Sequence, residues 1–260
     1  TRNLEEHQAV RAAAGLFDVS HMGCWDARGP EVVAFLDLVA VNDVTLLKVG
    51  DSQYTAFFDV DGTPLDDLLV YRMGEDHFLV VVNASNNDKD WAWVNGVLKG
   101  EVMIDPARPW VRWDGPEGSV VLRDLRQPSA ADDMRVELAI QGPKSKDILL
   151  ALGGPTGDLA KLSKLQWAGI TQVTLGGFDM IISRTGYTGE RVAYELFVHP
   201  DRIVELWYRL LEIGEPLGLK PCGLAARDSL RIEAGLPLYG HELEGPLNLT
   251  MAEAGFGTYP

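Results

Sequence analysis

Residues 53–72, QYTAFFDVDGTPLDDLLVYR, contain two apolar, strand-like runs on either side of a turn cluster. The runs at 53–58 and 68–72 flank the tetrapeptide DGTP, and this pattern predicts an antiparallel hairpin. Asp66 and Asp67 stand where the turn enters the second strand. Because adjacent side chains of a strand point to opposite faces, only one of the two can reach a binding site. The residues alone leave open that both are solvated carboxylates at a strand end.

The second half of the chain repeats this order of elements. Strand-like runs at 170–175 and 178–183 are joined by a Gly-Gly pair, which again predicts a hairpin. A Gly-Pro pair at 29–30 recurs 113 positions later at 142–143, and a helix-like run follows each pair. We therefore expect an α+β fold of two pseudo-repeated units, each a mainly antiparallel sheet with helices on one face, and a cleft between them.

The expected domain boundaries follow these repeats. Residues 1–104 form the first α+β unit, and residues 136–222 form the second. A bridging insertion at 105–135, rich in Pro, Asp, Arg and Gly, connects the two and contains strand-like pieces at 110–113 and 119–122. Residues 223–260 are expected to form a helix and a loop that lines the cleft.

Composition and charge exclude several classes of protein. The chain has 260 residues, and its 38 acidic and 23 basic side chains give a net charge of −15. Binding of nucleic acid phosphates needs clustered Lys and Arg, so no nucleic acid partner is expected. No apolar run approaches the ~18 residues of a membrane span. Two cysteines cannot build a disulfide framework, which indicates a reducing compartment such as the cytoplasm. Five scattered histidines predict no metal site.

Three further features could bind a ligand, and each also has a plain structural explanation. The loop GYTGE at 186–190 is bracketed by glycines, so it can approach a ligand closely or simply turn the chain. Glu195 lies inside an apolar strand, where a carboxylate is costly unless it points outward or meets a cationic or amidine-like partner. Arg227 lies in a mainly apolar helix and either forms a salt bridge or grips a ligand carboxylate.

Six blocks of the sequence form an ordered series: EHQAVR at 6–11 with GLFDVSHMG at 15–23, DDLLVY at 66–71, VNASN at 82–86 with KD at 89–90, QGP at 141–143, SRTGYTGE at 183–190, and GLAARDSLR at 223–231. In this order the blocks resemble the glycine-cleavage T-protein family, which comprises tetrahydrofolate-dependent aminomethyltransferases. The resemblance covers nearly the whole chain and is weakest at 105–133. The family's N-terminal aromatic-Gly-Trp segment and its C-terminal β-barrel domain are absent, so we expect that both ends of a longer protein are missing.

The resemblance implies an aminomethyltransferase of glycine cleavage. Such an enzyme takes the aminomethyl group from the lipoyl arm of the H-protein, releases ammonia and passes the methylene to tetrahydrofolate, giving 5,10-methylenetetrahydrofolate. The partner implied is a lipoylated H-protein in the cytoplasm, or in the mitochondrial matrix of a eukaryote.

Two other functions stay open on the same scaffold. The first is a tetrahydrofolate-dependent demethylase that acts on a small methylated donor. The segment 189–195 is one residue longer than the family pattern, and Leu236 stands where some members have a tyrosine. Both departures concern the donor more than the folate. The second is a folate-binding relative without catalysis, against which the retained Asp67 and Glu195 weigh.

The resemblance also implies roles for particular residues. Asp67 matches the family's essential aspartate beside the reactive nitrogens of the folate, where a carboxylate stabilises positive charge as the carbon–nitrogen bond breaks and can take up a proton. Glu195 matches the carboxylate that accepts the parallel N–H donors of the pterin ring. The other matched positions contact the folate in the family: Asn83 at the ring, Tyr54 and Tyr187 as site tyrosines, and Arg227 near the tail.

Overall fold

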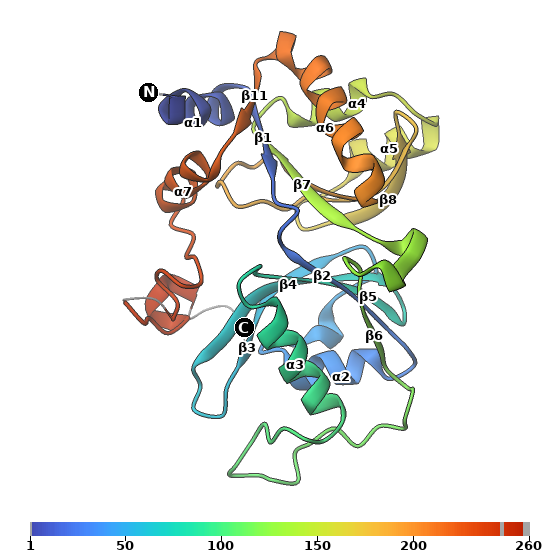
Figure 1. The fold of residues 1–260 in the computed structure, drawn as a ribbon, viewed down its shortest axis with the longest axis vertical. Coiled ribbons are helices and arrows are strands. Elements are labelled where there is room, and N and C mark those ends of the chain that lie inside the picture. The colour runs from blue at the N-terminus through green and yellow to red at the C-terminus, as the bar shows by residue number, and fades with distance from the viewer. Residues whose placement is uncertain (1, 245–246, 257–260) are drawn as a thin grey trace. The chain divides into compact units, whose positions relative to one another are not determined.

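The structure, a computed structural model, describes residues 2–244 and 247–256. It has the α+β fold expected from the sequence, and its chain divides into two compact units. Unit 1 comprises Thr1–His21 and Leu125–Leu236, and unit 2 comprises Met22–Asp124 and Pro237–Pro260. Each unit is built around one sheet (Figure 1).

Unit 2 contains a five-stranded antiparallel sheet whose first hairpin is the one predicted from residues 53–72. Its apolar face is covered by helices α2 (Val32–Val39) and α3 (Asn87–Leu98). Alternate residues of each strand enter this core, as a period of two requires. The strands in spatial order are β3 (Ser52–Phe58), β4 (Pro64–Gly74), β5 (His77–Val82), β2 (Gly23–Arg28) and β6 (Val121–Asp124).

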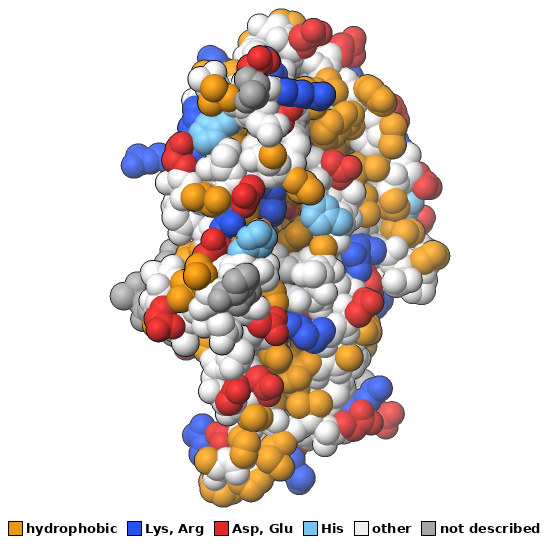
Figure 2. All heavy atoms as spheres, turned by 60° about the vertical axis from the view of Figure 1, so that its left-hand side comes forward, with side chains coloured by type: hydrophobic (Ala, Val, Ile, Leu, Met, Phe, Trp, Pro, Cys, Tyr) orange, Lys and Arg blue, Asp and Glu red, His pale blue; other side chains and the backbone are white. Residues whose placement is uncertain are grey.

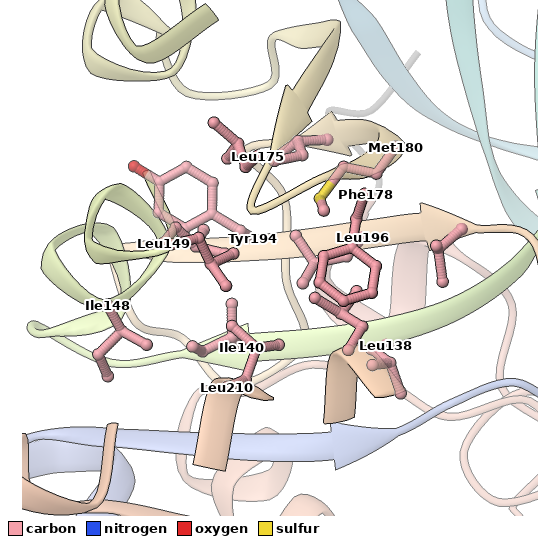
Figure 3. Close-up of a cluster of buried hydrophobic side chains, with 14 of the residues drawn as sticks. Leu138, Ile140, Ile148, Leu149, Leu175, Phe178, Met180, Tyr194, Leu196 and Leu210 are labelled. Atoms are coloured by element: carbon pink, nitrogen blue, oxygen red, sulfur yellow. The ribbon is translucent and has the colours of Figure 1, made fainter. Parts of the chain in front are cut away.

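Unit 1 contains a six-stranded sheet in which only the β1–β11 pair is parallel. Helices α4 (Ser145–Ala151), α5 (Thr156–Lys164) and α6 (Pro200–Gly214) pack on one face of it. Leu138, Ile140 and Leu196 point into this core (Figure 3). The strands in spatial order are β8 (Ile170–Leu175), β9 (Phe178–Ser183), β10 (Ala193–Val198), β7 (Val136–Gln141), β1 (Ala14–Asp18) and β11 (Leu219–Cys222).

The two Gly-Pro pairs mark equivalent turns of a structural repeat. Gly29 and Gly142 have φ angles of +129° and +126°, a region that disfavours other residues. A Cβ at Gly29 would lie 2.1 Å from the Ser119 carbonyl oxygen, and a Cβ at Gly142 would lie 2.4 Å from that of Val10. Backbone therefore crowds both positions, which explains why each is a glycine. The four strands of each repeat also share one order, β3-β4-β5-β2 and β8-β9-β10-β7.

The two repeats have exchanged a strand. β1 directly precedes β2 along the chain, yet it pairs with β7 of the other sheet. β6 directly precedes β7, yet it pairs with β2. Each sheet thus contains one strand that leads into the first strand of the other repeat.

This exchange explains why the compact units differ from the contiguous ranges expected from the sequence. The pairing of β1 groups Thr1–His21 with the second repeat, and the pairing of β6 groups the bridge up to Asp124 with the first. Residues 110–113 do not form a strand, so that prediction was wrong. The Trp113 ring there packs edge-on against Phe35, with ring centroids 5.1 Å apart. Helix α5 and strand β11 were not predicted.

Ion pairs around the buried Asp26 stabilise unit 2. Asp26 on β2 accepts hydrogen bonds from Arg28, His77 and Arg123. Although burial acts to raise it, these hydrogen bonds lower the pKa of Asp26 to about 2. A lowered carboxyl pKa stabilises the folded state above the unfolded pKa of 3.8, and the stabilisation is lost as the pH falls toward 2.

We expect Asp26→Asn to lower the free energy of unfolding at pH 7 by about 2 kcal/mol. The difference from the native protein should shrink as the pH falls below 4, and urea unfolding at several pH values measures it. Asp76→Asn, at an exposed turn of the same unit, is the control. A difference that does not change with pH would show that the Asp26 charge is not what stabilises the fold.

No helix within the described part of the chain is both long and apolar enough to cross a bilayer. On the face drawn in Figure 2, acidic and basic side chains are interspersed. The excess of negative charge therefore does not gather in a single patch on that face.

Candidate functional site

The pleat of β4 sends Asp66 and Asp67 to opposite faces of the unit 2 sheet. Leu68 and Val70 point into the core beneath α2 and α3. Asp66 shares their face and is completely buried. Asp67 therefore points to the other face, as Tyr54 of β3 does. Only Asp67 of the pair is available on the face that the helices leave open.

Asp67 is held there by two side chains predicted from the sequence. The Tyr54 hydroxyl donates to Asp67 Oδ2 at 2.9 Å, and Asn83 Nδ2 donates to Oδ1 at 2.9 Å. Burial, reinforced by the charge of Asp66, raises the pKa of Asp67 to about 7, although both hydrogen bonds act to lower it. The structure thus brings Tyr54, Asp67 and Asn83 into one cluster, in which a carboxyl group can exchange a proton near neutral pH.

Asp66 supports this cluster from the core side and is not the solvated strand-end carboxylate of the alternative interpretation. Its carboxylate accepts from the Asn83 backbone N–H at 2.9 Å, from Asn83 Nδ2 at 2.9 Å and from Asn86 Nδ2 at 2.6 Å. Asn83 Nδ2 therefore lies between the two carboxylates and fixes the position of Asp67.

Sequence reasoning gave no role to a third carboxyl group, Asp90. It lies on α3, has no exposed surface, and receives no hydrogen bond from a donor among the described residues. Its side-chain hydrogen bond is with the Asp66 carboxylate. Burial and the negative charge of Asp66 raise the pKa of Asp90 to about 9, although Lys89 acts to lower it. Asp90 is therefore a neutral acid at pH 7. The sequence showed only a Lys-Asp pair on a helix.

The sign of this pKa shift yields a stability prediction. A carboxyl group that is neutral when folded and ionised when unfolded destabilises the fold increasingly as the pH rises from 3.8 toward 9. We expect Asp90→Asn to remove this loss and to raise the free energy of unfolding at pH 8, relative to the native protein, by about 2 kcal/mol or more. Urea unfolding at pH 5 and pH 8 measures the difference.

Asp88→Asn is the matched control, because Asp88 lies exposed on the same helix. It should change the stability equally at both pH values. If Asp90→Asn behaves like this control, Asp90 is ionised in the folded protein.

Lys89 forms hydrogen bonds both to the start of β4 and to the later segment of the chain that contains Tyr239. Its Nζ donates to the Leu65 carbonyl oxygen at 2.6 Å and to the Tyr239 hydroxyl at 2.9 Å. The ammonium group also lies 4.6 Å from the centroid of the Tyr239 ring. The segment that contains Tyr239 therefore lies next to the strand that carries Asp67.

Unit 1 presents Glu195 on the sheet face opposite its helices. Its neighbour Leu196 enters the core, so Glu195 points away from it. Thr185 Oγ1 donates a short hydrogen bond to Glu195 Oε2, and Ser183 Oγ lies 3.4 Å from the same oxygen. Both hydroxyl groups therefore lie beside one oxygen of the Glu195 carboxylate.

Gln141 of β7 fixes the glycine-bracketed loop. Its Oε1 accepts from the Tyr187 backbone N–H at 3.2 Å and from Thr188 Oγ1 at 2.6 Å. The Arg227 guanidinium carbon lies 4.4 Å from the Tyr187 ring centroid, in a cation–π contact. The structure thus pairs Tyr187 with Arg227, and burial together with the Arg227 charge lowers the pKa of nearby His21.

Unit 1 also contains a carboxyl group that the sequence analysis missed. Glu137 of β7 is 5% exposed, and its Oε2 has no hydrogen-bond partner within the described residues. Burial and the charge of Glu195 raise the pKa of Glu137 well above its usual range, while Arg227 acts to lower it. The only sequence signal was an acidic residue inside an apolar strand, the same signal that drew attention to Glu195.

These two groups of side chains have the chemistry to accept hydrogen bonds from N–H groups and to exchange protons. Each of the predicted site residues belongs to one of them: Tyr54, Asp67 and Asn83 to unit 2, and Tyr187, Glu195 and Arg227 to unit 1. Across residues 2–244 and 247–256, no three His, Cys, Asp or Glu side chains are grouped so that they could hold a metal ion. Carboxylates that face hydroxyl and amide donors suit a polar heterocycle.

Comparisons with known proteins agree with the resemblance of the sequence blocks. Two proteins named aminomethyltransferase, from Bacillus cytotoxicus and Bacillus cereus strain AH187, are each 42% identical over 253 residues, which cover 97% of this chain and 61% of theirs. The chain therefore spans about three fifths of the length of these relatives.

The crystal structure of glycine cleavage system aminomethyltransferase T from Bartonella henselae is also similar. It is 32% identical, has a TM-score of 0.74, and the match covers 93% of this chain and 56% of that one. A heterotetrameric sarcosine oxidase from Corynebacterium shares the fold at 16% identity and a TM-score of 0.52.

The family described as the GCVT N-terminal domain matches residues 2–259. This match covers almost the whole chain. The two relatives that are 42% identical to it are both named aminomethyltransferase. The chain belongs to the glycine cleavage T-protein family.

Proposed function

We propose that the protein is the aminomethyltransferase of glycine cleavage, with tetrahydrofolate as the acceptor and a lipoylated H-protein as the donor. The observation that carries the proposal is the Tyr54–Asp67–Asn83 cluster, in which a carboxyl group with a pKa of about 7 is fixed by two hydrogen bonds. A group of this kind can take a proton from an attacking amine and stabilise positive charge on the transferred carbon. The names and identities of the relatives support the same reaction.

Side chains within each unit match particular groups of a reduced folate. Glu195 is a carboxylate that suits the paired N–H donors of the pterin ring. Arg227 suits a carboxylate of the folate tail, and its guanidinium carbon lies 4.4 Å from the centroid of the Tyr187 ring. When bound, tetrahydrofolate supplies the nucleophilic nitrogens that accept the methylene. Asn83, which donates to both Asp66 and Asp67, keeps the reacting carboxylate in place.

The test is an ammonia-release assay with aminomethyl-lipoyl H-protein and tetrahydrofolate. Ammonia should appear rapidly only when the protein, the loaded H-protein and tetrahydrofolate are all present. Release that does not depend on tetrahydrofolate would contradict the proposal. Turnover of a small methylated amine with tetrahydrofolate, and without H-protein, would instead identify a folate-dependent demethylase.

A further inference from the structure

Asp66 is the residue through which the core side of unit 2 holds Asp67. Its carboxylate accepts from the Asn83 backbone N–H and from the side-chain amides of Asn83 and Asn86. The Asn83 amide also donates to Asp67 Oδ1 at 2.9 Å and to the Asp67 carbonyl oxygen at 3.0 Å. The same amide group thus serves both aspartates, so the position of Asp67 depends on how firmly Asp66 is held.

Helix α3 places Asp90 beside Asp66. The Asp90 backbone N–H donates to the Asn86 carbonyl oxygen at 2.8 Å, one helical turn earlier. Because residues four apart lie on the same face of a helix, the face whose Asn86 amide reaches Asp66 Oδ1 at 2.6 Å also carries Asp90. Asp66 and Asp90 are both completely buried. The side-chain hydrogen bond of Asp90 is therefore made with Asp66 inside the core.

The other groups around the pair show which of the two carries the proton. Two buried carboxyl groups in hydrogen-bond contact need a proton between them. Asp66 has three N–H donors, whereas neither oxygen of Asp90 has a donor among the described residues. The adjacent Lys89 ammonium group donates instead to the Leu65 carbonyl oxygen and the Tyr239 hydroxyl. The proton therefore belongs to Asp90, whose O–H group donates to the Asp66 carboxylate.

We propose that Asp90 is a positioning residue for the proposed reaction, and that its carboxyl O–H group holds Asp66, and through Asp66 the Asn83 amide, against Asp67. Asp90 acts through these side chains and not by contact with a substrate. The inference rests on the proposed function, because Asp67 is the reacting carboxyl group there.

A neutral acid suits this position better than a cation would. A lysine or arginine beside Asp66 would also donate hydrogen bonds, but it would offset the negative charge of Asp66. That charge helps to raise the pKa of Asp67 to about 7. The Asp90 O–H group supplies a donor and leaves the charge in place, so one arrangement fixes Asp67 and keeps it able to exchange a proton near neutral pH.

The test compares three variants of Asp90 with a matched control. Asp90→Leu branches at the same atom as aspartate but has no donor, and Asp90→Ala removes the donor without adding volume. Asp90→Asn supplies an amide N–H in place of the carboxyl O–H. Asp88→Leu makes the same change at an exposed position of the same helix, away from Asp66.

Hydrogen exchange of the Asn83 backbone N–H, which donates to Asp66, measures the anchor without requiring activity. Its protection at pH 7, relative to that of the paired amides of β2 and β5, should fall about tenfold in Asp90→Leu and Asp90→Ala. Asp90→Asn and Asp88→Leu should keep the native ratio. Native protection in Asp90→Leu and Asp90→Ala would overturn the inference, and so would a loss that Asp90→Asn does not restore.

Turnover shows whether the anchor matters for the chemistry. Asp90→Leu should lower kcat for ammonia release about tenfold while the KM for tetrahydrofolate stays within about threefold, and Asp90→Asn should recover most of the native kcat. In an Asp66→Asn background, Asp90→Leu should change kcat by less than about twofold, because Asp90 acts through Asp66. An equal loss of kcat in both backgrounds would contradict this route.

The two measurements separate this inference from the proposed function. If the native protein releases no ammonia while hydrogen exchange responds as expected, the proposed function fails and the Asp66–Asp90 anchor stands. If every Asp90 variant releases ammonia at the native rate, the proposed function stands and the positioning role of Asp90 fails.

Discussion

Asp67→Asn is expected to lower the rate of aminomethyl transfer by about 100-fold or more, while the affinity for tetrahydrofolate stays within about threefold of the native value. The asparagine side chain has the shape of aspartate and can still accept from Asn83 Nδ2 and contact the Tyr54 hydroxyl. It carries no charge and takes up no proton, so the binding surface is kept and the chemistry is lost. Ammonia release and folate titration measure the two effects separately.

The pH profile gives an independent check of the role of Asp67. Because the pKa of Asp67 is raised to about 7, the active carboxylate form is gained as the pH rises through that value. The native rate should therefore increase across pH 6–8, and the residual rate of the variant should not show this acid limb. Asp59→Asn, at the exposed end of the same hairpin, is the control and should keep the native profile. Near-native turnover in Asp67→Asn would remove Asp67 from the mechanism.

Glu195→Ala should produce the complementary result, a loss of folate binding. Removal of a charge-assisted hydrogen-bond acceptor costs about 1.5–3 kcal/mol, which corresponds to roughly a 10- to 150-fold higher Kd. The Thr185 hydroxyl would also lose its acceptor. Calorimetric titration with tetrahydrofolate measures the change, and saturating folate should restore part of the turnover.

Two further variants make this result specific to Glu195. Glu195→Gln keeps the length and one acceptor oxygen, so its Kd should lie between those of the native protein and Glu195→Ala. Glu205→Ala removes an exposed carboxylate of α6 that pairs with Arg202, and it should leave the Kd unchanged. Unchanged affinity in Glu195→Ala would mean that Glu195 faces something other than the folate.

The sequence predicted those site residues whose role depends on a local motif. Tyr54 and Asp67 lie on the paired strands β3 and β4, and Asn83 follows β5. The family resemblance, and not the strand pattern, led us to expect that these three residues meet. Asp90 and Glu137 were missed because their chemistry arises from neighbours distant in sequence. A carboxyl group becomes a neutral acid only when folding buries it beside another carboxylate.

For the fold as well, local elements were predictable from the sequence and long-range strand pairing was not. The two hairpins follow from local periodicity and turn residues, and the structure has them at the expected positions. The pairing partners of β1 and β6 depend on which distant edge each strand reaches, and no local pattern encodes this choice. The short strand β11 contains Lys220 and Pro221, whose composition is not typical of a strand.

The exchange of β1 and β6 also determines what a broken chain could do. A cut in the irregular stretch between Gly100 and Gly118 would leave one fragment with β1 to β5 and another with β6 to β11. Each fragment would lack one strand of its own sheet and would hold the strand that the other lacks. Such fragments should be poorly folded when expressed alone and should reassemble when they are co-expressed. The chain is thus suited to a split-protein design in which recovery of folate binding reports the meeting of the two halves.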